Sequence, residues 1–593
     1  MKKKSLVFAL ALFVIFTGFL PAQENLWFTT VLKEKFLDKQ GNPLTGKGVL
    51  IGDVDSGIDI FHPFFFFADG GEFNWIDVNK DGVFTAGMDA VDFKGDGIPA
   101  SDGVLRYIEM NNNTYKMLKT DDKSFNPDMD FLYADKNNNK KRDFGEKDGF
   151  TENDPTYGEQ LFIAIDANGN GVLDAGEKIV ALKTSKVRSV REKDGTIRRR
   201  GKDLIKTEPD EVQHGTSVSG LVLGGQYGVN KLHGVAPDAE IVHANIKYDY
   251  TPRFARNFPD LVKFLRDEKI NILLFEDGEW MWEFMDGSTE EEILQNQIAA
   301  SGITVIGGGG NLASGKMHIQ DNLKKGKETV FKFSSPATGE GKKNDGAYAS
   351  FLWKGKDNKI SFVVTAPDGK KSKELNDGSG FVKVGNYNMF YAREISPRGT
   401  VMFKFAFSEK DSGTVNGDWQ FGLKASQDVQ IDGYVVDVTQ SWSGSTHWVS
   451  DKLTDERTIT FPSTSDSIIA VGAYTVNIAW GDKLNDLCTY SGRGNNISGK
   501  MGIDICAPGH TTFTCGPNNS YTIFSGTSSA APHVVGAVAL MLQYDPTLTH
   551  SEIRQILHKT ATSDSFTGSV PNTNWGYGKL NTEEAIKYVI QNR

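Results

Sequence analysis

The stretch Gly48-Val-Leu-Ile-Gly-Asp-Val54 is a short apolar run that leads directly into Asp55-Ser-Gly-Ile58. An apolar run of this length is typical of a strand that is buried on both faces of a parallel sheet. The stretch therefore predicts a buried parallel strand that ends at Asp55.

Other apolar runs alternate with helical patterns along the chain. Runs typical of buried strands are found at 240–245, 271–275, 302–306 and 467–472, and helical patterns at 259–268 and 289–300. Strands that alternate with helices predict a mostly parallel sheet between layers of helices. We therefore expect a three-layer α/β body within residues 23–593.

Two long stretches interrupt this alternation. Residues 65–207 are polar and rich in Asp, Asn, Lys and Gly, with little helical periodicity. Residues 314–461 contain alternating segments separated by Asp-Gly turns, which is the pattern of an antiparallel β-sandwich. We interpret both stretches as insertions into the α/β body and refer to them as the acidic insertion (65–207) and the β insertion (314–461).

The N-terminus has the features of a secretory signal peptide. Met1-Lys-Lys-Lys4 precedes an apolar run from Leu6 to Leu20, and small residues follow near Ala22. A membrane anchor is the alternative, but a span usually needs about 20 apolar residues, and this run is shorter. We therefore expect removal of residues 1–22 and a secreted or extracytoplasmic protein without a stable membrane span.

Charge and cysteine content exclude several classes of protein. The net charge of −11 argues against nucleic acid as a partner, because nucleic-acid binding needs a basic surface. The cysteines Cys488, Cys506 and Cys515 allow at most one internal disulfide, so the chain is not a disulfide scaffold. A cysteine nucleophile is a weaker alternative to the serine described next.

Three segments hold the residue types that acyl transfer needs. Asp55 ends a strand, His214 opens a helical pattern, and Gly526-Thr-Ser-Ser-Ala-Ala-Pro532 leads into an apolar helix. A hydroxyl nucleophile needs an imidazole to take its proton and a carboxylate to hold that imidazole in one tautomer. Asp55, His214 and Ser528 are therefore the candidate triad. Taken singly, they have simpler interpretations as a turn residue, a core histidine and a helix N-cap.

These segments resemble the three signature motifs of the subtilase family. Further segments that match the family are Gly234-Val-Ala-Pro-Asp-Ala239, Gly307-Gly-Gly-Gly-Asn311, 505–509 and 575–578, so the resemblance covers the body but neither insertion. The resemblance implies a subtilisin-like fold and a secreted serine endopeptidase that acts on proteins or peptides. It also implies that the Asn311 side chain and the Ser528 backbone N–H bind the oxyanion.

Two functions of other kinds stay open at this point. One is a calcium-dependent surface binding protein built on an inactive peptidase frame. The other is a serine hydrolase that acts on esters, although the order of the motifs and the Asn311 segment favour amide cleavage. The sequence gives no oligomeric state.

One segment departs from the family pattern. Where the family usually has Asn-x-Ser-x-Gly to pair with the substrate, this chain has Leu274-Phe-Glu-Asp-Gly278. Glu276, Asp277 and Gly278 are therefore candidate substrate-binding residues. Charge complementarity would then favour basic side chains at the cleavage site, and solvated loop charges are the alternative interpretation.

The acidic insertion contains three segments with the spacing of twelve-residue calcium loops. Residues 166–177 match that spacing, with oxygen ligands at alternate positions, glycine at position 6 and Glu at position 12. Residues 135–146 repeat it with Lys140 in place of the glycine, and a third loop begins at Asp77 but has no Glu at position 12. We expect structural calcium and no organic cofactor, with Asx-rich surface turns as the alternative. The candidate ligands are Asp77, Asn79 and Asp81; Asp135, Asn137, Asn139, Lys141, Asp143 and Glu146; and Asp166, Asn168, Asn170, Val172, Asp174 and Glu177.

Overall fold

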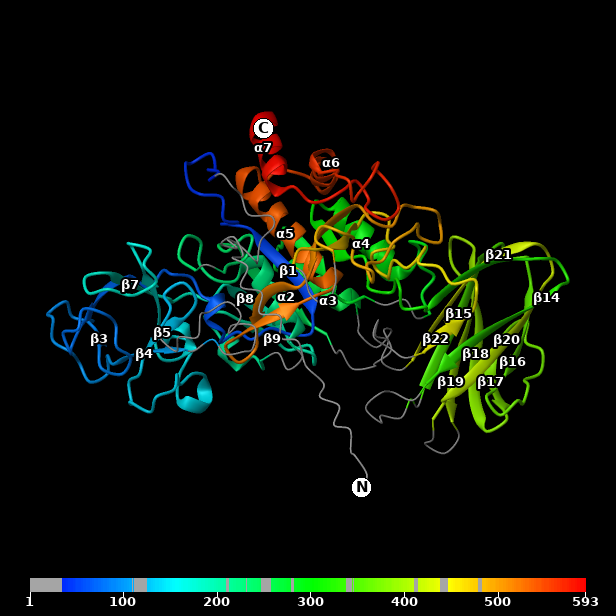
Figure 1. The fold of residues 1–593 in the computed structure, drawn as a ribbon, viewed down its shortest axis with the longest axis horizontal. Helices are drawn as coiled ribbons and strands as arrows, with labels where there is room; N and C mark the ends of the chain where they lie inside the picture. The colour runs from blue at the N-terminus through cyan, green and yellow to red at the C-terminus, as the bar shows by residue number, and fades with distance from the viewer. Residues whose placement is uncertain are drawn as a thin grey trace, which may run out of the picture.

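The structure is a computed structural model with three parts in a row. It describes residues 35–108, 110, 125–209, 213–230, 232–246, 258–278, 282–336, 344, 346–409, 414–437, 446–477 and 483–593. Figure 1 shows a central body of helices around a sheet, with the sheets of the acidic insertion at one end and those of the β insertion at the other. The expected signal peptide at 1–22 lies outside the described residues.

The central body is built on an eight-stranded sheet in the order β24-β23-β12-β11-β1-β10-β8-β9. Every neighbouring pair is parallel except β8 and β9, which are antiparallel. The prediction of an α/β body with a mostly parallel sheet is therefore confirmed. The strands are β1 (Leu50–Asp55), β8 (Val187–Arg191), β9 (Ile197–Arg199), β10 (Glu240–Asn245), β11 (Ile272–Phe275), β12 (Thr304–Gly308), β23 (Ile469–Thr475) and β24 (Ile505–His510).

Helices cover both faces of this sheet. Successive strand residues point to opposite faces, so Ile51 packs in the core that holds α2, α5 and α7, whereas Leu50 and Val54 pack with α3 and α4. Asp53 and Asp55 share the face of Ile51, and their side chains are therefore covered by α2 and α5. The helices are α2 (His214–Leu223), α3 (Phe258–Asp267), α4 (Glu290–Ala300), α5 (Thr527–Tyr544), α6 (His550–Thr560) and α7 (Thr582–Asn592), with short 3-10 turns η1 (Pro63–Phe65), η2 (Glu146–Asp148), η3 (Pro155–Tyr157) and η4 (Leu204–Lys206).

The β insertion contains two antiparallel sheets that share one aromatic core. The sheets have the orders β13-β21-β15-β19-β18-β17 and β16-β20-β14-β22. Phe351 on one sheet and Phe421 on the other have ring centroids 4.9 Å apart, so the two sheets pack face to face. The strands are β13 (His318–Leu323), β14 (Glu328–Ser335), β15 (Gly346–Lys354), β16 (Ile360–Thr365), β17 (Ser379–Val384), β18 (Tyr387–Ile395), β19 (Thr400–Glu409), β20 (Gly417–Ala425), β21 (Val429–Asp437) and β22 (His447–Val449).

The acidic insertion contains a six-stranded antiparallel sheet in the order β3-β2-β7-β6-β5-β4. Its strands are β2 (Glu72–Ile76), β3 (Ala90–Val91), β4 (Leu105–Ile108), β5 (Phe131–Ala134), β6 (Leu161–Ile165) and β7 (Lys178–Ala181). The sequence placed β8 and β9 in this insertion as well, but β8 pairs with β10 in the central sheet. The body therefore resumes before residue 207.

A hairpin links the acidic insertion to the body. It consists of β25 (Thr512–Gly516) and β26 (Ser520–Phe524), and α5 follows it closely. The hydroxyl of Tyr521 in this hairpin donates to the Met129 carbonyl oxygen at 2.8 Å. The ring of Phe524 lies 5.3 Å from the ring of His214. This hairpin therefore provides one connection between the acidic insertion and the helices that carry His214 and Ser528, in addition to the apolar core that the insertion shares with α2.

Candidate active site

Asp55 and His214 meet at the carboxyl edge of the central sheet. β1 ends at Asp55, and α2 begins at His214. Both carboxylate oxygens of Asp55 lie 2.8 Å from Nδ1 of His214. The Asp55 carboxylate is fully buried, whereas the His214 side chain is 22% exposed. The carboxylate therefore fixes one ring nitrogen and leaves the Nε2 side of the ring for proton transfer.

The close approach of α2 to β1 depends on Gly215. A Cβ at this position would lie 2.0 Å from the Gly57 carbonyl oxygen and 2.8 Å from Nε2 of His243. No side chain fits at these distances, so the glycine after His214 is required by the packing that brings the imidazole to Asp55.

Ser528 lies in the first turn of α5. The residue before the helix, Gly526, has φ 132°, a conformation that side-chain-bearing residues rarely adopt. Its N–H donates to the Gly509 carbonyl oxygen at 2.8 Å, which holds the turn in place. Ser528 is partly exposed while Thr527 on its N-terminal side is buried. The helix N-terminus favours negative charge beside the Ser528 hydroxyl.

Asn311 lies directly beside this turn. Its Oδ1 accepts a hydrogen bond from the Thr527 N–H at 2.9 Å. A Cβ on Gly526 would lie 3.4 Å from the Asn311 Nδ2, so the amide nitrogen faces the turn that leads into Ser528. A fixed amide donor next to a hydroxyl nucleophile is the arrangement that stabilises an oxyanion.

Glu276 lies at the end of β11, where the sequence analysis expected it to face a substrate side chain. Its N–H donates to the Val54 carbonyl oxygen at 3.1 Å, and the residue is only 6% exposed. The carboxyl group forms a hydrogen bond with the Ser528 side chain. Burial, with Asp55 and Asp53 nearby, raises the pKa of Glu276 well above its usual value.

The strand register explains the burial of Glu276, which excludes a solvated loop charge, and its role in substrate binding stays a prediction. Glu276 is two residues beyond Leu274 and therefore shares the sheet face that α5 covers. Its side chain consequently meets the nucleophile instead of open solvent. Asp277 is also buried, and a Cβ on Gly278 would lie 3.2 Å from Oγ1 of Thr460.

Comparison with known proteins identifies the family. The sequence model of the Subtilase family matches residues 46–255 and 443–578, which is more than half of the chain. The chain belongs to the subtilase family. The resemblance found in the sequence is thus confirmed. The family is one of serine-type endopeptidases, and the contact of Asp55 with His214 at 2.8 Å agrees with that assignment.

Individual relatives align with only part of this subtilase. Subtilisin DY of Bacillus licheniformis is 37% identical over 134 residues, which are 22% of this chain and 42% of that protein. Serine protease AprX of Bacillus subtilis is 33% identical over 146 residues, or 32% of its length. The structure of the CspB protease of Clostridium perfringens superposes with a TM-score of 0.63 over 93% of this chain and 96% of that one, at 18% identity. That likeness shows a shared fold.

A second histidine–aspartate pair lies beside the candidate triad of this subtilase. Asp53 is fully buried, and its Oδ2 lies 3.4 Å from Nε2 of His243 on the adjacent strand. Nδ1 of His243 in turn contacts the Asn245 Oδ1 at 2.9 Å. Burial raises the pKa of Asp53 to about 6. This pair was not predicted from the sequence. The signal that could have revealed it is the presence of a polar residue inside each of two otherwise apolar strand patterns, Asp53 in β1 and His243 in β10.

The three candidate calcium loops of the acidic insertion have the same backbone arrangement. Each begins directly after a strand, with Asp77 after β2, Asp135 after β5 and Asp166 after β6. Both carboxylate oxygens of Asp166 accept backbone hydrogen bonds from within its loop, from Gly169 at 2.7 Å and Gly171 at 2.7 Å. The sixth residues of the loops, Gly82, Lys140 and Gly171, all have positive φ, so Lys140 adopts the conformation that favours glycine.

A closing carboxylate completes each loop in the same way. In the 166 loop, Glu177 accepts hydrogen bonds from the N–H groups of Ala167 and Asp174, the second and ninth residues, at 2.8 and 2.9 Å. In the 77 loop, Asp89 accepts from the corresponding residues Val78 and Thr85 at 2.9 and 2.6 Å.

In the 135 loop the corresponding carboxylate is not the expected Glu146. Glu159 accepts hydrogen bonds from the N–H groups of Lys136 and Asp143, at 2.7 and 3.0 Å. Glu146 instead lies on η2, 3.5 Å from the Lys206 amino group. Glu146 therefore does not close the loop in this structure, and Glu159, which lies outside the twelve-residue spacing, takes that position.

The remaining candidates outside the triad are weaker. Cys488, Cys506 and Cys515 are all buried and form no disulfide. Burial raises the pKa values of Cys506 and Cys515, which makes these two thiols poor nucleophiles. In the part of the chain that the structure describes, no group of three or more His, Cys, Asp or Glu side chains is arranged to hold a metal ion. A cation in the acidic loops would therefore depend on amide and main-chain oxygens as well.

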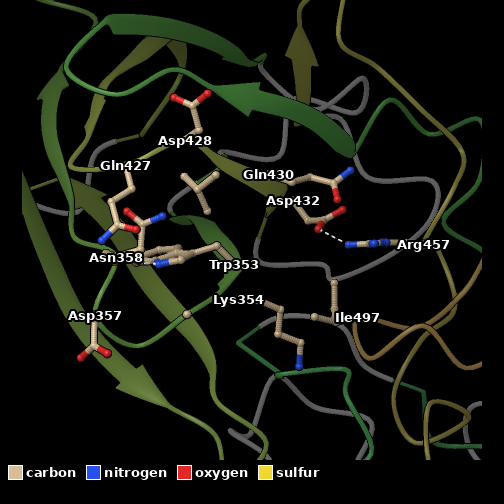
Figure 2. Close-up of a pocket in the computed structure, with 12 residues that line it drawn as sticks. Trp353, Lys354, Asp357, Asn358, Gln427, Asp428, Gln430, Asp432, Arg457 and Ile497 are labelled. Carbon is tan, nitrogen blue, oxygen red and sulfur yellow. Dashed lines mark hydrogen bonds and ion pairs between the residues drawn. The ribbon is translucent and has the colours of Figure 1, made fainter.

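A hollow of about 540 Å³ lies where the β insertion meets the subtilase body. Figure 2 shows its mostly polar lining, in which Nη1 of Arg457 donates to Oδ2 of Asp432 at 2.6 Å. Trp353 contributes a buried ring to the wall. None of the residues that line the hollow belongs to the triad, so the two sites are separate.

Proposed function

We propose that the protein is a secreted, calcium-stabilised serine endopeptidase that hydrolyses peptide bonds through an acyl-enzyme intermediate. The observation that carries this proposal is the contact of Asp55 with Nδ1 of His214 at 2.8 Å, next to Ser528 in the first turn of α5. A buried carboxylate, an oriented imidazole and a hydroxyl at a helix N-terminus are the components of nucleophilic acyl transfer.

The steps follow from the roles of these residues. His214 takes the proton of Ser528 as Oγ attacks the scissile carbonyl carbon, and Asp55 stabilises the imidazolium that forms. The amide group of Asn311 and the N–H of Ser528 hold the oxyanion. His214 then gives its proton to the leaving amine, and in the second half it takes a proton from the water that attacks the acyl-enzyme.

The position of the β insertion supports a protein substrate. Met285 and Leu312, from segments that follow Gly278 and Asn311, pack against Leu352, Met402 and Tyr434 of the insertion. The insertion is therefore fixed against the segments that follow Gly278 and Asn311, where we expect an extended substrate to contact it. Secretion rests on the leader pattern at residues 1–22. Among the described residues, the structure has no helix of sufficient length and apolarity to cross a bilayer.

The test of this proposal is cleavage of an unfolded protein. We expect the purified enzyme to cut reduced, alkylated casein at internal positions and to be inhibited by a serine-directed fluorophosphonate. New N-termini identified by mass spectrometry would measure the cleavage. A folded protein that cleaves only esters, or neither substrate, would contradict the proposal.

The oxygen-rich loops fit calcium by the chemistry of their donors. Carboxylate, amide and main-chain oxygens are the ligands that calcium prefers. In the 166 loop these would be Asp166, Asn168, Asn170, Asp174 and Glu177, with the Val172 carbonyl oxygen. The 135 loop would use Glu159 in place of Glu146, and the 77 loop would use Asp89. Bound calcium would neutralise these carboxylates and rigidify a region with a small core.

Substitution of Glu159 distinguishes this ligand set from the one expected from sequence. Millimolar calcium should stabilise the wild type by about 1–2 kcal/mol for each occupied extracellular-type loop. We expect Glu159→Gln to reduce the calcium-dependent rise in Tm and Glu146→Gln to leave it unchanged. Differential scanning calorimetry with calcium and with a chelator measures both variants. The reverse pattern, with only Glu146→Gln impaired, would contradict the assignment.

A further inference from the structure

We propose that Glu276 is a titratable positioning residue for the nucleophile, which leaves Ser528 reactive while its carboxyl is neutral and withdraws it from His214 when that carboxyl ionises. The inference rests on the peptidase function proposed above and adds a control of that function by pH. It concerns a position where the family pattern has a small serine.

The location of Glu276 brings its carboxyl to the reacting atoms. Its backbone continues the pairing of β11 with β1, because its N–H donates to the Val54 carbonyl oxygen one residue before Asp55. Its side chain points to the sheet face that α5 covers, and there it forms a hydrogen bond with the Ser528 side chain. Asp55, Ser528 and Glu276 therefore lie around one small volume at the sheet edge.

The surroundings of Glu276 disfavour its charged form. Two carboxylates face it from β1, those of Asp55 and Asp53, and the residue is buried. The nearby imidazoles are engaged elsewhere, His214 of α2 with Asp55 at 2.8 Å and His243 of β10 with Asp53 at 3.4 Å. Burial and like charge both raise the pKa of Glu276. The neutral carboxyl consequently persists above the pH at which an exposed glutamate ionises.

The two protonation states place the Ser528 proton differently. A neutral carboxyl can donate its O–H to Oγ of Ser528, so the serine keeps its own O–H for His214. A carboxylate can only accept, so the serine O–H would turn to Glu276 and away from its base. The ionised carboxyl also adds a second negative charge beside Asp55. That charge disfavours the oxyanion that forms when Ser528 attacks. Reactivity should therefore fall as the pH rises through the pKa of Glu276.

The experiment compares the pH dependence of Ser528 labelling by a fluorophosphonate, which needs no knowledge of the natural substrate. For the wild type we expect a bell-shaped profile, in which the rate rises as His214 loses its proton and falls as Glu276 ionises. Glu276→Gln keeps an N–H donor for Ser528 but cannot ionise. Its profile should rise to a plateau without the alkaline decline, with labelling at least about tenfold faster than wild type at the most alkaline pH. Glu276→Ser should behave in the same way.

Glu290→Gln serves as the matched control, because it removes the same charge from an exposed site on α4 on the other face of the sheet. It should keep the wild-type profile. If Glu276→Gln does not fold, infrared spectroscopy measures the protonation state of Glu276 directly. The band of a protonated buried carboxyl should be present in the wild type at neutral pH and absent from Glu276→Ser.

Superimposable profiles for wild type and both Glu276 variants would overturn the role of Glu276 while the peptidase function stands. Absence of labelling in well-folded wild type at every pH would overturn the proposed function and this inference with it.

Discussion

Replacing Ser528 with Ala is expected to lower kcat by about 10⁶-fold, because removal of the nucleophile from a triad costs nearly as much as removal of the whole triad. Ser528 is partly exposed in the first turn of α5, and the hydrogen bonds that hold this turn are made by Gly526 and Thr527. The variant should therefore keep the fold, with only a small change in Tm from the loss of its hydrogen bond to Glu276. Steady-state cleavage of casein, together with a thermal melt, measures both quantities.

One control decides how this result is interpreted. Ser529→Ala changes the neighbouring serine, whose hydroxyl contacts Oγ1 of Thr512 at 2.6 Å within the protein. That variant should lose stability and keep most of its catalytic rate. Equal activity of wild type and Ser528→Ala would assign the nucleophile to another residue and would contradict the triad.

Removal of the Asn311 amide donor has the second largest expected effect. Loss of one oxyanion donor typically costs about 10²–10³ in kcat, with little change in KM, since the donor acts mainly in the transition state. Asn311 also has a structural contact through Oδ1 to the Thr527 N–H at 2.9 Å. A substitution must therefore separate these two roles.

Asn311→Asp and Asn311→Ala together achieve this separation. Asp keeps an oxygen that can accept from Thr527 but replaces the amide donor by a carboxylate, which repels an oxyanion. Both variants should therefore lose at least about 10²-fold in kcat. If Asn311→Asp retained wild-type kcat while Asn311→Ala lost it, Asn311 would act only by holding the turn before Ser528.

The parts of the fold that depend on local sequence could be predicted. The apolar run at 240–245 coincides with β10 at Glu240–Asn245, and the helical pattern at 289–300 coincides with α4 at Glu290–Ala300. Each has a local signal, the apolar residues Ile241, Val242 and Ala244 in one case and the capping box of Thr289 and Glu292 in the other. Local signals of this kind do not depend on distant contacts.

The parts that depend on contacts between distant segments could not be predicted. Glu159 closes the loop that begins at Asp135 although it lies outside the twelve-residue spacing. The contact of Glu276 with Ser528 was not predicted, because a motif gives the position of a side chain but not the sheet face to which it points. Asp53 and His243 meet only because β1 and β10 are adjacent in this register. Strand register, and the closing of a loop by a residue outside its own sequence motif, depend on how the whole chain folds.

The acidic insertion provides a route by which calcium could influence catalysis. Tyr521 connects the insertion to the hairpin before α5 through its hydrogen bond to Met129, and Phe524 of the same hairpin contacts the His214 ring. Loosening of the insertion would therefore act on the helices that hold His214 and Ser528, although the loops themselves contribute no reacting group.

The most direct test of the nucleophile is covalent labelling with an active-site fluorophosphonate, followed by mass spectrometric identification of the modified residue. The structure leads us to expect stoichiometric modification of Ser528 in the wild type, and none in Ser528→Ala or in wild type that has been denatured first. Modification of a different residue, or no modification of folded, calcium-loaded wild type between acidic and alkaline pH, would contradict the assignment of Asp55, His214 and Ser528 as a working triad.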